Sequence, residues 1–143
     1  MARVLAIDVG GRRIGLAVSD PSGTLARPLT TIAVKSAAEG VERVADEIGR
    51  LSRDDAGLSS IVVGLPVRLD GSPSEQTTRV AAFIDALKVR TSVPIVTADE
   101  RLTSREAESR LSVHERDWRV RKAKLDAEAA AIILQEYLDR AQD

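Results

Sequence analysis

The sequence predicts an α/β fold in which a mixed sheet of five strands carries helices on both faces. Three observations lead to this prediction. Two apolar runs near the start of the chain are separated by only a glycine-containing turn, which is the pattern of a β-hairpin. A third apolar run follows closely, so the first three strands form a meander. Amphipathic helical patterns then alternate with short β-branched runs, and this alternation is typical of strands covered by helices.

The meander is predicted from three segments. Residues 4–9 form a continuous apolar run that ends at Gly10 and Gly11, and residues 14–19 form the second strand. The motif Asp-Pro-Ser-Gly at residues 20–23 provides the next turn, because these residue types favour turn conformations. The third strand is expected over residues 29–34.

The remaining elements alternate between helix and strand. Apolar residues at helical spacing predict a helix over residues 41–51, and the run SIVVG at residues 60–64 reads as a buried strand. A capping box is expected at Ser72, with Pro73 at the first helical position and Glu75 at the third. We expect that helix to bury Val80, Phe83, Ile84 and Leu87 on one face.

The last third of the chain is expected to contain one strand and two helices. Residues 94–98 form the strand, and Thr103 caps the helix that follows, with Glu106 at its third position. Residues 116–124 are basic and lack an apolar pattern, whereas residues 125–138 form a strongly apolar helix. The predicted order is therefore β-β-β-α-β-α-β-α-α.

The composition indicates one domain over residues 1–143. The chain is 43% hydrophobic, so it can build a substantial core, and it contains no cysteine for disulfides or thiolate metal sites. Its net charge of −1 gives no general support for nucleic-acid binding, so any such surface must be local. Neither a membrane-spanning stretch nor a leader is recognised, and we expect a cytoplasmic protein.

Carboxylates on three separate elements are the main functional signal. Asp8 interrupts the first apolar strand, Asp99 or Glu100 ends the strand at residues 94–98, and Asp126 begins the last helix. Ligands of such sheets bind at the carboxyl ends of the parallel strands, where these side chains are expected to meet. Oxygen ligands of this kind suit Mg²⁺ or Mn²⁺. Two such ions about 3.5–4 Å apart can activate water and stabilise the leaving oxygen of a phosphodiester.

The last helix offers a test of which carboxylate faces the sheet. Asp126 shares a face with Ala130 and Ile133. At about 100° per residue, Glu128 lies roughly 200° away from Asp126. We therefore expect Asp126 to face the sheet and Glu128 to face water.

Each carboxylate also has a purely structural interpretation. Asp8 could accept hydrogen bonds from the amides of the glycine turn, and Asp126 could be favoured by the helix dipole in the first turn. Asp99 or Glu100 could be an ordinary loop charge. The joint occurrence of all three at one sheet edge favours the functional interpretation.

Two basic segments are candidates for contact with phosphate. Arg68 lies in the loop over residues 65–72, and residues 116–124 form the one dense basic segment, which also holds the only tryptophan. Such a segment either is a solvated surface or binds a phosphate backbone and stacks a base. The candidate residues in it are Trp118, Arg119, Arg121, Lys122 and Lys124.

Four motifs carry a resemblance that covers nearly the whole chain. They are AIDVGGRRIGLAVSD at residues 6–20, VVGLPVRLDGS at 62–72, ADERLTSREAE at 98–108 and KLDAEAAAIILQEYL at 124–138. In this order they resemble the YqgF family, also called RuvX, of Holliday-junction resolvases or pre-16S rRNA nucleases. The resemblance implies an RNase H-like fold and divalent-metal-dependent phosphodiester cleavage. It also implies a role in maturing the 5′ end of 16S ribosomal RNA.

The resemblance also assigns residues and partners. It makes Asp8, Glu100 and Asp126 the catalytic and metal-binding positions, and Glu100 is preferred over Asp99 because of the motif Asp-Glu-Arg. Arg13 and Arg101 are further candidates for contact with phosphate. The implied partner is nucleic acid, either precursor rRNA or branched DNA, and the chain would act as a monomer or as a homodimer.

Two other functions remain open at this stage. One is an ATP-binding domain of the actin, Hsp70 and sugar-kinase type, since these also begin with an Asp-x-Gly strand-turn-strand that Asp8 and Gly10 match loosely. The other is a non-catalytic nucleic-acid-binding module that uses the basic segment. Clustered carboxylates argue against the second, because they repel a polyanion.

Overall fold

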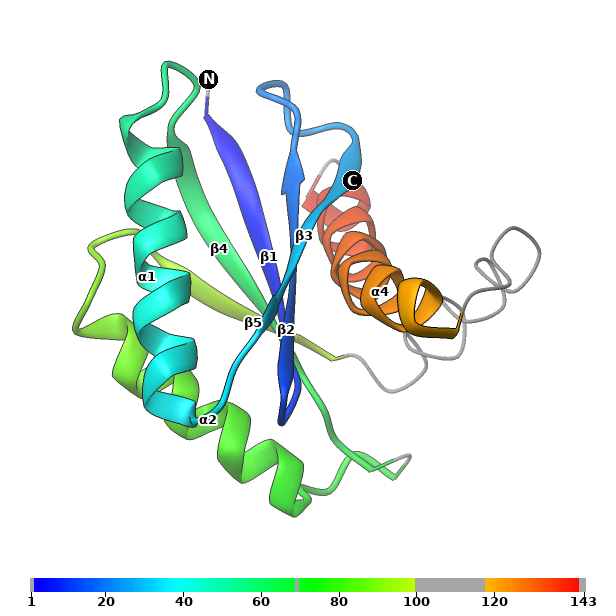
Figure 1. Cartoon of the computed structure of the whole chain (residues 1–143). Coiled ribbons are helices and arrows are strands. Elements are labelled where there is room, and N and C mark those ends of the chain that lie inside the picture. Colours follow the sequence, from blue (N-terminus) through cyan, green and yellow to red (C-terminus); the bar gives the residue numbers. More distant parts are fainter. Residues whose placement is uncertain (1, 69, 100–117, 142–143) are drawn as a thin grey trace.

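A mixed sheet of five strands forms the centre of the computed structural model, which describes residues 2–68, 70–99 and 118–141 (Figure 1). The strand order is β3-β2-β1-β4-β5. The meander pairs antiparallel, whereas β1–β4 and β4–β5 pair parallel. The carboxyl ends of β1, β4 and β5 therefore share one edge of the sheet. The strands are β1 (Arg3–Val9), β2 (Arg13–Ser19), β3 (Ala26–Ala33), β4 (Leu58–Leu65) and β5 (Ile95–Asp99).

Helices cover both faces of the sheet, as predicted. α1 (Ala37–Arg53) and α2 (Glu75–Lys88) lie on one face, and α4 (Trp118–Ala141) lies on the other (Figure 1). α4 packs mainly across β2, β3 and β1. None of the described helices is both long and apolar enough to cross a membrane.

The two faces of the sheet use alternate residues of the same strands, because successive side chains of a strand point in opposite directions. The face toward α1 and α2 holds large aliphatic side chains from β1 and β2, and α2 contributes the four residues expected of it, including Phe83. The face toward α4 lacks large apolar side chains among the described residues of the sheet, and α4 packs on it with alanines as well as with Ile133, Leu134 and Leu138. Small residues occur on both sides of this contact. They are Ala6 of β1, Ala17 of β2, and Ala130 and Ala131 of α4.

The start of α2 differs from the prediction. The cap is Ser74 rather than Ser72, and Thr77 completes a capping box with it. Ser72 is instead part of a turn, where its N–H and its hydroxyl donate to Asp70 Oδ1 at 2.9 and 2.6 Å. The Thr77 hydroxyl also donates to the carbonyl of Pro66, which fixes the helix against the end of β4. The local motif was ambiguous because two serines flank the proline, and the Asp70 turn determines which one caps the helix.

The last helix begins earlier than predicted. α4 starts at Trp118, not at residue 125, so residues 118–124 of the basic segment form its first two turns. Arg, Lys and Ala are strong helix formers, and the missing apolar pattern indicated only that these turns carry no regular apolar face. The helix expected to begin at Thr103 lies outside the described residues.

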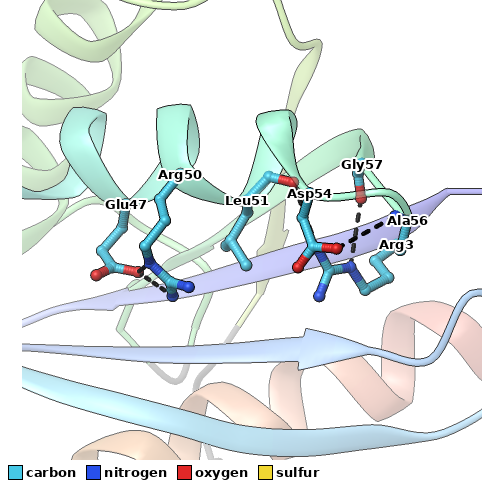
Figure 2. Close-up of polar contacts among 7 residues, drawn as sticks. All are labelled: Arg3, Glu47, Arg50, Leu51, Asp54, Ala56 and Gly57. Atoms are coloured by element: carbon cyan, nitrogen blue, oxygen red, sulfur yellow. Dashed lines mark hydrogen bonds and ion pairs between the residues drawn. The ribbon is translucent and has the colours of Figure 1, made fainter.

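Arg3 joins the beginning of β1 to the end of α1 (Figure 2). Its side chain is largely buried, and its guanidinium donates to the carbonyls of Gly57 at 3.4 Å and Leu51 at 3.3 Å. The same group lies 3.3 Å from a carboxylate oxygen of Asp54. These contacts connect the start of β1 with the last turn of α1 and with the loop that follows it. They lie at the opposite end of β1 from Asp8.

Candidate active site

Asp8 lies on the α4 side of the sheet, near the carboxyl end of β1. Val4 and Ala6 pack in the core beneath α4, and strand alternation places Asp8 on the same face. The residue is half-buried. A carboxylate is thus set among apolar neighbours at the sheet edge where ligands of such folds bind.

Gly15 brings Asp126 next to Asp8. Gly15 is the cross-strand partner of Asp8 on β2, and the Cα atoms of such partners are about 4.5–5.5 Å apart. A Cβ atom on Gly15 would lie only 2.0 Å from the carbonyl oxygen of Asp126 and 2.9 Å from the amide nitrogen of Ala127. The backbone of α4 therefore occupies the space that any larger residue would fill. The backbone of Asp126 thus lies against the strand position that pairs with Asp8.

The carboxylates of α4 are less solvated than the helical periodicity suggested. Asp126 is half-buried, and its Oδ2 is inaccessible to solvent. Glu128 was expected to face water, but it too is half-buried and its Oε1 is inaccessible. That expectation was wrong because periodicity gives the angle between two side chains but not what covers the far side of the helix. Ala129 and Ile132 are buried there as well.

Asp99 is not turned toward Asp8. Ala98 packs in the core beneath α4, whereas Ile95 packs against the core of the opposite face. By alternation Asp99 shares the face of Ile95, and it is exposed. Of the two alternatives left open by the residues alone, Asp99 therefore does not join the pair at Gly15. Glu100 lies outside the described residues.

Arg13 shares the face of Asp8 and Asp126. Ile14 and Leu16 of β2 pack toward α1 and α2, so Arg13 and Gly15 point toward α4. Arg13 is half-buried, and within the described part of the chain its Nη1 is inaccessible to solvent and has no hydrogen-bond partner. Arg13 therefore supplies positive charge on the face of the sheet that carries Asp8.

The structure describes the side chains of only some of the other basic candidates. Arg68 is exposed in the turn after β4, where its N–H donates to the carbonyl of Ser72 at 2.9 Å. This turn follows the carboxyl end of β4, so it lies at the same edge as Asp8. Arg101 lies outside the described residues. The side chains of Trp118, Arg119, Arg121, Lys122 and Lys124 also lie outside the described part, although their backbone forms the start of α4.

The donors at Gly15 suit a hard divalent cation. Asp8 and Asp126 offer only carboxylate oxygens, which are the ligands that Mg²⁺ and Mn²⁺ prefer. Among residues 2–68, 70–99 and 118–141, no group of three or more His, Cys, Asp or Glu side chains is close enough to hold a metal. A third carboxylate, if it contributes, comes from elsewhere in the chain.

Gly15 is the site residue that sequence reasoning did not single out. It lies within a strand, RIGLAVS, between two large aliphatic residues. A glycine inside a strand often marks a close approach of another backbone, and that was the available signal. The sequence alone could not show that the approaching backbone belongs to Asp126, 111 residues later.

Comparisons with known proteins identify the family of this chain. The family model described as "RuvX: Holliday junction resolvase" matches residues 2–140.

Three curated relatives share the name "Putative pre-16S rRNA nuclease". The protein of Roseiflexus sp. (strain RS-1) is 41% identical over 137 residues, covering 96% of this chain and 94% of the relative. That of Anaeromyxobacter sp. (strain K) is 41% identical over 138 residues, with coverages of 96% and 97%. That of Chloroflexus aurantiacus (strain J-10-fl) is 44% identical over 136 residues, with coverages of 95% and 86%.

A solved structure confirms the predicted fold class. RuvC of Thermus thermophilus, in complex with a Holliday junction substrate, matches with a TM-score of 0.58 and 21% identity. The match covers 99% of this chain and 96% of that one. At this identity the likeness concerns the fold, which is RNase H-like. The family model and the curated relatives span nearly the whole chain, and the chain belongs to the RuvX family.

Proposed function

We propose that this protein is a divalent-metal-dependent nuclease that hydrolyses phosphodiester bonds. The observation that carries the proposal is the contact at Gly15, where α4 approaches the sheet so closely that Asp126 lies beside the cross-strand neighbour of Asp8. Both residues are half-buried. Partial burial strengthens the interaction of carboxylates with a cation, because fewer water dipoles screen it.

Each residue of the site has a role in this proposal. Asp8 and Asp126 bind the cation, with Glu100 as a third ligand, and Gly15 sets the separation of the first two. Bound divalent cations activate the attacking water and stabilise the leaving oxygen in phosphodiester hydrolysis. Arg13, on the same face, binds a phosphate oxygen of the substrate, because a guanidinium matches phosphate geometry. Arg68, Arg101 and the basic start of α4 extend this contact along the strand.

The preferred substrate of this proposal is precursor 16S rRNA, processed at its 5′ end. Support comes from the curated relatives, which are named as pre-16S rRNA nucleases. A branched DNA junction is the second candidate, because the family model is described as a Holliday junction resolvase. Symmetric cleavage of a junction would require two active sites, and therefore a homodimer.

The proposal is tested by cleavage of three labelled substrates. They are a precursor rRNA fragment containing the 5′ end of 16S rRNA, an unrelated single-stranded RNA and a four-way DNA junction, each with Mg²⁺, Mn²⁺ or EDTA. We expect metal-dependent cleavage that Asp8→Asn and Asp126→Asn lower by about 10³-fold or more, as for other essential catalytic groups. Asp85→Asn, at an exposed position of α2, is the matched control and should retain full activity.

Metal binding supplies a readout that does not depend on turnover. Titration with Mn²⁺, followed by the electron paramagnetic resonance of the free ion, should show binding that Asp8→Asn weakens and Asp85→Asn does not. Cleavage that persists in EDTA, or that survives Asp8→Asn, would contradict the proposal. If the junction is cut and the RNA substrates are not, the activity is that of a resolvase.

A further inference from the structure

A cavity of about 620 Å³ lies on the face of the sheet opposite to Asp8. It is bounded by the β1–β2 turn, by the beginning of α1 and by one side of α2, which converge at the same end of the sheet in Figure 1. Pockets for small molecules usually measure about 300–1,000 Å³. The cavity is thus large enough for a small ligand, and it takes no part in the proposed cleavage.

The walls of this cavity are largely apolar. Val9 and Ile14 line it from the sheet, and Phe83 lines it from α2. Ala82 and Ala86, also on α2, line the cavity and are exposed to solvent. Because these two side chains are small, α2 leaves a hollow where larger residues would have filled the space.

Positive charge is found at the rim. Arg79 and Arg90 line the cavity from α2, and both are exposed. Arg79 donates to Gln76 Oε1 at 3.3 Å. Within the part of the chain that the structure describes, neither guanidinium forms an ion pair, and no acidic residue lines the cavity. The beginning of α1 also faces this space with Ala37 and Ala38. The N-terminal end of a helix carries a partial positive charge, which adds to that of the arginines.

We propose that this cavity binds a small amphipathic anion. The apolar body of the ligand fills the space between Val9, Ile14 and Phe83, and its carboxylate or phosphate binds Arg79 and Arg90. An apolar ligand without charge would leave the arginines unused, and a cation would be repelled by them. The cavity is separate from the proposed nuclease site, because strand alternation places Val9 and Asp8 on opposite faces of the sheet.

The proposal is tested by nuclear magnetic resonance titration of the full chain with four eight-carbon probes. Octanoate and octyl phosphate carry the expected chemistry, octan-1-ol is neutral and octylammonium is cationic. We expect saturable shifts of the Val9, Ile14 and Val41 methyl signals with both anions. Binding of octan-1-ol should be weaker by about tenfold, as expected on losing one charge-assisted interaction, and octylammonium should not bind.

Three variants and one control locate the site. Arg79→Ala and Arg90→Ala should each weaken octanoate binding by about three- to tenfold, whereas Arg27→Ala, at an exposed position of β3 outside the cavity, should not. Ala86→Phe places a ring in the cavity and should abolish binding. The unperturbed signals of each variant report that it is folded.

Two results would overturn the proposal. One is equal affinity for the anionic, neutral and cationic probes, which would indicate unspecific apolar contact. The other is unchanged octanoate binding in Ala86→Phe, which would place the ligand elsewhere. If Asp8→Asn loses metal-dependent cleavage but still binds octanoate, the cavity and the nuclease site are independent of each other. If the unmodified chain binds octanoate but cuts no substrate, only the proposed nuclease activity is contradicted.

Discussion

The two faces of the sheet are made by the same strands but are packed in different ways. Toward α1 and α2, Ile14 and Leu16 of β2 are large and almost completely buried. Toward α4, their neighbours are Gly15 and Ala17, and the helix backbone itself reaches the sheet at Gly15. One face gains stability from buried apolar volume, whereas on the other face small residues let the α4 backbone approach the sheet. Alternation allows a single strand to do both.

The largest effect on stability is expected when volume is removed from the α1 and α2 face. Leu16 is fully buried, and Leu16→Ala should lower the free energy of unfolding by about 2–5 kcal/mol, through lost burial and the cavity left behind. Urea denaturation followed by circular dichroism measures this loss. Cleavage per folded molecule should remain close to that of the unmodified protein. A folded Leu16→Ala protein without activity would show that the two faces are not separable.

The next effect is expected when volume is added to the α4 face. Gly15→Ala forces Asp126 away from Asp8, because its Cβ would lie 2.0 Å from a backbone oxygen. We expect the free energy of unfolding to fall by about 1–3 kcal/mol, the usual range for overpacking. Mn²⁺ affinity and cleavage should fall by more than the fraction of the protein that this loss of stability unfolds.

Gly49→Ala is the matched control for Gly15→Ala. Gly49 lies within α1, where an added Cβ meets only the flexible end of Arg53 at 3.3 Å. Replacing a helical glycine by alanine should stabilise the protein by about 0.5–1 kcal/mol and leave cleavage unchanged. If Gly15→Ala retains full Mn²⁺ affinity and activity, the close approach is not what assembles the site.

The smallest effect concerns the loop at the edge of the α4 face. The pKa of Asp20 is lowered by hydrogen bonds, first from the Ser22 hydroxyl and then from the N–H groups of Leu25 and Thr24. Gln135 of α4 contacts the same loop, accepting from the N–H of Ala26 and donating to the carbonyl of Thr24, both at 2.9 Å. A substitution of Asp20 should therefore weaken the contact between this loop and Gln135 of α4.

The pH dependence of this effect has a definite sign. Because the folded-state pKa of Asp20 is depressed, its contribution to stability is present above the unfolded-state pKa of about 3.9 and is lost as the pH falls through the lower folded value. Asp20→Asn should thus be slightly less stable than the unmodified protein at pH 7 and equal to it near pH 2. Urea midpoints at several pH values measure the difference, with Asp46→Asn on α1 as the control. A difference that persists at pH 2 would contradict this explanation.

The architecture could be predicted from the sequence because it depends on local patterns of apolar and turn residues. The apolar runs, the glycine turn at Gly10 and the β-branched segment of β4 each indicated a strand, and the predicted mixed sheet is confirmed. The boundaries that failed, at Ser74 and Trp118, depend on neighbouring turns and on helix propensity rather than on apolar periodicity.

The site was less accessible to such reasoning. The candidate positions Asp8 and Asp126 followed from an unexpected charge in a strand and from helical periodicity. Gly15 could not be assigned, because its role depends on a contact with a distant part of the chain. Glu128 was misjudged for a related reason, since its surroundings depend on tertiary packing.

The small residues of the α4 face also bear on how the protein is synthesised. α4 follows every other described element in the chain, so it leaves the ribosome after β1–β5, α1 and α2. Until then the strip formed by Val4, Ala6, Ala17 and Val62 is uncovered, but its small side chains offer little apolar surface for unwanted association. Asp8 and Asp126 come together only when α4 docks. If these carboxylates hold the metal as proposed, the site is completed only after α4 has packed on the sheet.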